Sequence, residues 1–138
     1  MTRPTVPHEV LRGPGAWVVV ALAAVFLLIG VLFIASPRTG AGVFGIPAEE
    51  AGGLAYVRAL ALRDLALGLY LLGLLCFSSR RAIGIVLAAT VVIPVGDMLL
   101  ILGREGMKSP GHLLLHGFSG ACVAMVALWL LRPASPAE

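Results

Sequence analysis

The chain has 138 residues, of which 59% are hydrophobic and only 12% are charged, with a net charge of +3 and a mean hydropathy of +1.02. A soluble domain usually carries about 25% charged residues because its surface faces water, so this composition excludes an ordinary soluble domain. The Lys and Arg residues are scattered, with no run longer than Arg80-Arg81, and this excludes a typical nucleic-acid-binding surface. The length is that of one domain.

Four apolar segments are each long enough to cross a bilayer, whose core needs about 20 helical residues. We interpret the first, residues 16–35, as a retained span, because its apolar stretch is longer than that of a typical signal peptide. The others, in chain order, are residues 53–77, 82–103 and 110–131. The sequence therefore predicts an all-α fold, an integral membrane four-helix bundle over residues 16–132, with tails at residues 1–15 and 133–138.

The long connection between the first two spans, residues 36–50, is rich in Gly and Pro and includes the apolar pair Val43-Phe44. We expect it either to lie in the membrane interface or to cap the bundle. In the third span, Pro94 lacks a backbone N–H group, which predicts a kink beside Asp97.

The distribution of basic residues predicts the orientation of the bundle. An even number of spans places both termini on one side. That side carries five basic residues and the opposite side three: Arg3, Arg12, Arg80, Arg81 and Arg132 against Arg38, Arg104 and Lys108. Because cytoplasmic loops are enriched in Lys and Arg, we expect cytoplasmic termini and a location in the plasma membrane.

The predicted spans contain ionisable residues that lipid does not tolerate well. A charge at mid-membrane costs a few kcal/mol, so such residues usually face the protein interior and pair. At a rise of about 1.5 Å per residue, Arg58, Asp97 and His116 are expected at one level, each roughly 8–10 Å inside the outer end of its span. Arg63 and Asp64 are expected roughly 7–9 Å deeper. This convergence predicts an intramembrane polar site.

These residue types suit acid–base chemistry on a lipophilic small molecule. Asp97 or Asp64 would act as acid or base, and His116 would relay protons. Arg58 and Arg63 would orient the carboxylates and stabilise an oxyanion. No hydrolase, phosphate-loop, metalloprotease or dinucleotide motif occurs in the sequence. We therefore expect no cofactor, and reactions such as isomerisation, cyclisation or epoxide opening.

Other functions also fit the pattern. His112 and His116 have the i, i+4 spacing of a metal-binding pair, but two histidines alone predict no metal site. The charges could instead specify helix packing or partner binding in a non-catalytic accessory or structural membrane protein. Transport is disfavoured, because four spans are few for a carrier and no inverted repeat is visible. The sequence leaves open whether the protein is an enzyme and whether it forms a homo-oligomer. Its expected partners are the lipid bilayer and a lipophilic small molecule.

One stretch has the pattern of a known family. The sequence YVRALALRDLALG at residues 56–68 resembles a domain-of-unknown-function family of small bacterial and fungal membrane proteins, themselves similar to DoxX-like four-span proteins. The residues FGIP at 44–47 and the pair Gly96-Asp97 fit the same pattern. The resemblance covers about residues 17–131 and implies four helices and a membrane location. It implies no established activity, so no catalytic residue follows from it.

Overall fold

The computed structural model describes residues 13–133, and the predicted tails at residues 1–15 and 133–138 fall almost wholly outside this range. The described chain is helical, and no strand occurs between residues 13 and 133. In chain order the helices are α1 (Pro14–Ala35), α2 (Pro37–Phe44), α3 (Ala51–Phe77), α4 (Arg80–Thr90), α5 (Val92–Glu105), the short 3₁₀ helix η1 (Gly106–Lys108) and α6 (Pro110–Leu131). The predicted all-α fold is confirmed.

Four helical stretches are long and apolar enough to cross a membrane: α1, α3, the run Arg80–Lys108 and α6. The first three begin two residues earlier than the sequence predicts, and the last has the predicted bounds. Large apolar side chains cover the outside of the bundle, including Phe77 at 91% and Trp17 at 75% exposure. Such a surface fits lipid and not water. The integral membrane bundle is therefore confirmed, whereas the membrane concerned and the side of the termini remain predictions.

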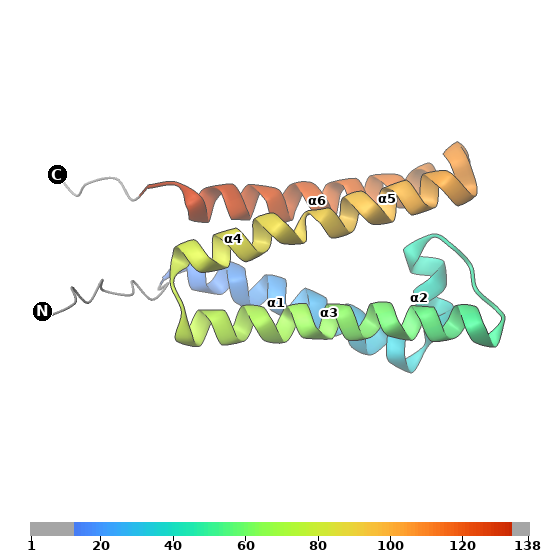
Figure 1. Ribbon diagram of the computed structural model, residues 1–138, viewed down its shortest axis with the longest axis horizontal. Helices are drawn as coiled ribbons and strands as arrows, with labels where there is room; N and C mark the ends of the chain where they lie inside the picture. Colours follow the sequence, from blue (N-terminus) through green and yellow to red (C-terminus); the bar gives the residue numbers. More distant parts are fainter. Residues whose placement is uncertain (1–12, 134–138) are drawn as a thin grey trace, which may run out of the picture.

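The bundle consists of two halves (Figure 1). In one half α3 packs along α1, and α2 lies across their end; in the other half α6 packs along α4 and α5. Only Ser78 and Ser79 connect α3 to α4. Glycine allows α1 and α3 to approach closely, since a Cβ atom on Gly68 would lie 2.6 Å from Cγ of Leu27. The start of α1 and the end of α6 lie at the same end of the bundle (Figure 1).

Two apolar clusters hold the halves together. The cluster nearer the start of α1 joins all four spans through the buried residues Val19, Ala23, Leu71, Ile83, Leu87, Val123, Ala127 and Leu130. The second cluster joins α1, α2, α3 and α5 through Phe33, Ala41, Phe44, Val57, Ala61 and Ile101. Asp64 on α3, and Asp97 on the run formed by α4 and α5, lie between the residues of these two clusters. The polar residues thus occupy a layer between two apolar ones.

The third span is interrupted at Val91, as Pro94 predicts. The hydrogen bond from the N–H of Val91 reaches the carbonyl of Ala88 at 3.3 Å, and that of Val95 reaches Val91 at a long 3.4 Å. The Pro94 ring packs against α6, because a Cβ atom on Gly120 would lie 3.0 Å from Cγ of Pro94. This contact brings α5 and α6 together one turn away from Asp97 and His116.

Residues 36–50 cap the bundle, which was one of the two expected positions. Most of the segment forms α2, which buries Ala41 and Phe44. A Cβ atom on Gly40 would lie 2.8 Å from Cγ of Phe33, so glycine is needed for α2 to fold back on α1. Gly45 ends α2 with a φ of 101°, in the left-handed region that favours glycine.

Candidate functional site

A polar cluster links α3, α5 and α6 inside the bundle. An oxygen of Asp97, Oδ1, lies 3.6 Å from Nη1 of Arg63, and the other, Oδ2, lies 3.6 Å from Nδ1 of His116. Nε of Arg63 donates a 3.1 Å hydrogen bond to Oδ1 of Asp64. Both carboxylates are buried, at 5% exposure for Asp64 and 6% for Asp97. We call these four residues the polar cluster: Arg63, Asp64, Asp97 and His116.

The polar cluster crosses the boundary between the two halves. Arg63 on α3 pairs with Asp97 on α5, and Nε2 of His116 on α6 lies 3.0 Å from the carbonyl oxygen of Phe44 on α2. Each of the two contacts therefore has one partner in each half. The same four residues can hold the halves together and can act on a molecule that lies between them.

The two ring nitrogens of His116 have different partners. A carbonyl oxygen only accepts, so Nε2 of His116 donates its proton to Phe44. Nδ1 of the same ring faces Asp97, and if both groups lacked a proton, two lone pairs would face each other. A proton on either atom would remove this repulsion. Arg63 contacts both carboxylates, so the cluster gathers opposite charges in a place where an unpaired charge would be costly.

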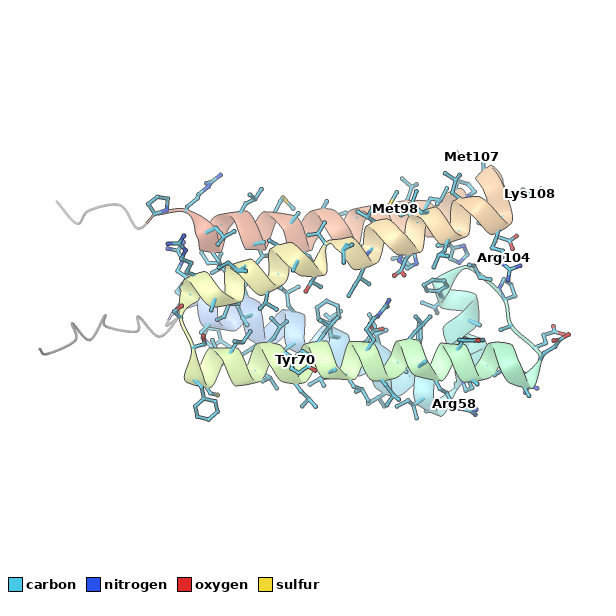
Figure 2. All side chains as sticks on the ribbon, viewed as in Figure 1. Arg58, Tyr70, Met98, Arg104, Met107 and Lys108 are labelled. Carbon is cyan, nitrogen blue, oxygen red and sulfur yellow. The ribbon has the colours of Figure 1, made fainter. Side chains whose placement is uncertain are left out.

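The expected layering of the charges is wrong. Sequence reasoning places Arg58 level with Asp97 and His116, and Arg63 and Asp64 deeper; the structure instead brings Arg63 and Asp64 to Asp97. α3 begins at Ala51, earlier than expected, and the long Arg63 side chain reaches across to α5. Arg58 is exposed, makes no ion pair with any residue in 13–133, and lies on the side of α3 turned away from α5 (Figure 2).

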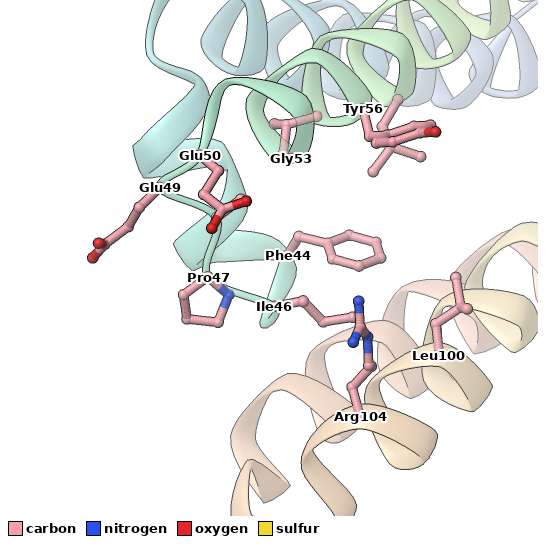
Figure 3. A pocket seen from close by; sticks show the side chains of 12 residues that line it. Phe44, Ile46, Pro47, Glu49, Glu50, Gly53, Tyr56, Leu100 and Arg104 are labelled. Atoms are coloured by element: carbon pink, nitrogen blue, oxygen red, sulfur yellow. The ribbon is translucent and has the colours of Figure 1, made fainter.

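A cleft of about 590 Å³ lies next to the polar cluster, between the start of α3 and the end of α5. Its volume lies within the range of about 300–1,000 Å³ that is typical of small-molecule sites. The loop after α2 closes one end of it, and Arg104 extends into it from α5 (Figure 3). The cleft is lined by Phe44, Ile46, Pro47, Ala48, Glu49, Glu50, Gly53, Tyr56, Val57, Leu60, Leu100 and Arg104.

Phe44 separates the cleft from the polar cluster. Its side chain lines the cleft, and its ring meets the imidazole of His116 edge to face, with centroids 5.3 Å apart. Sequence reasoning missed this role. The type of a residue does not show that its backbone carbonyl accepts a hydrogen bond from a histidine. The available signals were the apolar pair Val43-Phe44 in an otherwise Gly- and Pro-rich segment and the FGIP residues at 44–47.

His112 lies apart from the polar cluster. Its ring packs on Gly45, where a Cβ atom would lie 2.7 Å from Cγ of His112. Between residues 13 and 133, no three His, Cys, Asp or Glu side chains are grouped closely enough to hold a metal ion. His116 therefore acts with Asp97, and not with His112, in this structure.

Comparison with known proteins gives a family but no function. No curated protein and no solved structure matches the chain. The model of one family, described as Domain of unknown function (DUF4267), matches residues 23–130, which include the whole polar cluster and the whole cleft. The expected similarity to DoxX-like proteins is not confirmed. With nearly all of its membrane-spanning core matched, the chain belongs to the DUF4267 family of proteins of unknown function.

Proposed function

We propose that this membrane protein binds a lipophilic small molecule in the cleft and that the polar cluster performs acid–base chemistry on it. The observation that carries the proposal is the position of Phe44, which touches both the cleft and His116. The Phe44 ring lies between the cleft that it lines and the ring of His116, which in turn faces Asp97. Rotation of that side chain would bring a bound molecule to Asp97 and His116.

The chemistry would be redox-neutral and would need no cofactor. The His116–Asp97 pair gives its proton to a carbon–carbon double bond, a carbonyl or an epoxide oxygen of the bound molecule. In an isomerisation or cyclisation, the pair takes a proton back from a neighbouring carbon, so that no proton is gained or lost overall. In an epoxide opening, water supplies the hydroxyl group and returns the proton. Arg63 stabilises negative charge on the reacting oxygen, and Asp64 holds Arg63 in place.

Native mass spectrometry of the detergent-purified protein tests the binding step. Leu100 lines the cleft and is 57% exposed, so Leu100→Trp fills the cleft without disturbing the core. The neighbouring Leu99 is 64% exposed and does not line the cleft, which makes Leu99→Trp the matched control. We expect a bound lipophilic molecule on the wild type and the control and none on Leu100→Trp. The same bound mass on all three proteins, or on none, would contradict the proposal.

A structural role is the second candidate. It is favoured by the fact that the Arg63–Asp97 pair and the His116–Phe44 hydrogen bond both join the two halves. In that case the charges specify how the halves pack, and nothing binds in the cleft. This role predicts that Arg63→Leu disperses or unfolds the protein and that no lipophilic molecule copurifies. The two candidates thus differ in the result of the Leu100→Trp comparison.

A further inference from the structure

The mouth of the cleft carries charges of both signs on facing walls. The guanidinium of Arg104 extends from α5 toward the middle of the cleft, and the carboxylate of Glu50 extends toward it from the start of α3 (Figure 3). The carboxylate of Glu49 points away (Figure 3). Within residues 13–133, neither Arg104 nor Glu50 makes an ion pair. The two opposite charges therefore remain available to a ligand.

Glu50 occupies a position whose side chain often caps the helix, but the Glu50 side chain does not cap α3. The residue is the N-cap of α3, and its side chain makes no capping hydrogen bond. The positive end of the α3 helix dipole still favours a carboxylate at this position. Both oxygens of the Glu50 carboxylate are thus free to accept hydrogen bonds from a ligand at the mouth.

The rest of the cleft is mostly apolar. Ile46, Val57 and Leu60 line its inner part, and Leu100 lines the opposite wall. Tyr56, which is 78% exposed, lies at the rim, and tyrosine is enriched at the level of lipid headgroups. A charged mouth above an apolar floor has the polarity profile of a phospholipid.

We infer that the occupant of the cleft is a phospholipid whose headgroup carries a primary amine. Arg104 binds the phosphate, because a guanidinium matches phosphate oxygens with paired N–H donors. Glu50 accepts hydrogen bonds from the ammonium, which a trimethylated choline headgroup does not donate. The inference rests on the proposed function, in that the cleft binds a lipophilic molecule, and it names the class of that molecule.

Lipid competition tests the inference. The protein is reconstituted in nanodiscs with equal amounts of phosphatidylethanolamine, phosphatidylcholine and phosphatidylglycerol of the same acyl chains, and native mass spectrometry counts the retained lipids. We expect the wild type to prefer phosphatidylethanolamine over the other two by about tenfold, the ratio that one additional charged contact supplies. Glu50→Gln should abolish the preference over phosphatidylcholine, Arg104→Gln should lower retention of both phosphatidylethanolamine and phosphatidylglycerol, and Glu49→Gln should change neither.

The outcomes separate this inference from the proposed function. Equal retention of the three lipids by the wild type, or an unchanged preference in Glu50→Gln, overturns the lipid class. If Leu100→Trp still removes the bound molecule in that case, the cleft binds a lipophilic molecule of another class and the proposed function stands. If Leu100→Trp also leaves retention unchanged, both the inference and the proposed function fail.

Discussion

Replacing Arg63 should destabilise the protein far more than replacing Asp97, although the two residues form one ion pair. Arg63→Gln removes the cation that contacts both Asp64 and Asp97, so two buried carboxylates lose their partner. Asp97→Asn removes one carboxylate and leaves the Arg63–Asp64 hydrogen bond in place. We expect Arg63→Gln to lower the free energy of unfolding by about 3 kcal/mol and Asp97→Asn by about 1 kcal/mol.

The distance sets the size of the coupling between the two residues. Two unit charges 3.6 Å apart interact by about 4–5 kcal/mol at an effective dielectric constant of about 20. The Arg63 side chain is 31% exposed, and solvent screening reduces this to about 2 kcal/mol. The double variant Arg63→Gln/Asp97→Asn loses this interaction only once. The double variant should therefore cost about 2 kcal/mol less than the sum of the single variants.

Unfolding by sodium dodecyl sulfate in mixed micelles, followed by circular dichroism, measures the free energy of unfolding. It is measured for the wild type, the two single variants and the double variant. Arg58→Gln is the matched control on the same helix, because Arg58 is exposed and forms no ion pair within residues 13–133, and it should cost less than about 0.5 kcal/mol. Additive costs of the two single substitutions, to within about 0.5 kcal/mol, would refute the reasoning. So would a larger cost for Asp97→Asn than for Arg63→Gln.

Three further predictions concern packing. Gly68→Ala should lower the free energy of unfolding by about 1–3 kcal/mol, because the new Cβ atom would lie 2.6 Å from Cγ of Leu27 and 3.0 Å from the carbonyl oxygen of Ala23. The control is Gly73→Ala on the same helix, whose Cβ atom meets nothing within 4 Å. It should leave the free energy of unfolding unchanged in the same micelle assay. Phe44→Ala should open the wall between cleft and cluster, so peptide mapping after diethylpyrocarbonate treatment should show faster modification of His116, and an unchanged rate would be inconsistent with Phe44 as that wall. Arg80→Gln should lower the free energy of unfolding by about 1 kcal/mol. Nη2 of Arg80 donates a 2.6 Å hydrogen bond to the carbonyl of Trp129, and the guanidinium lies 5.9 Å from the centre of the Trp129 ring. A variant as stable as the wild type would show that this contact is not maintained in the membrane.

Much of the fold could be predicted from the sequence, because the length of an apolar run sets the length of a span. The run from Pro110 to Leu131 has the bounds of α6, and Pro94 marks the break between α4 and α5. The opposition of Asp97 and His116 was also predictable, since each lies a similar distance from the outer end of its span.

The height of Arg63 relative to Asp97 could not be predicted, because hydropathy sets the lengths of helices and not their relative heights. Much of the segment of residues 36–50 folds as α2, and α3 already begins at Ala51. In addition, an arginine side chain is long enough to reach a partner at a different height from its own backbone. Counting residues therefore assigned Arg58, and not Arg63, to the level of Asp97. The cleft was also beyond sequence reasoning, since it is formed by a loop, two helix ends and a gap between the halves.

The most direct test of the central claim, acid–base chemistry by the polar cluster on a lipophilic molecule, does not require the substrate to be known. The reconstituted protein is incubated with a lipophilic membrane extract in deuterium oxide, and in parallel in ¹⁸O-labelled water, and the lipids are analysed by mass spectrometry. Isomerisation or cyclisation places deuterium on carbon, and epoxide opening adds labelled oxygen. We predict one labelled lipophilic product with the wild type and at least a hundredfold less with Asp97→Asn, a variant that we expect to remain folded. Identical labelling by the two proteins would contradict the claim.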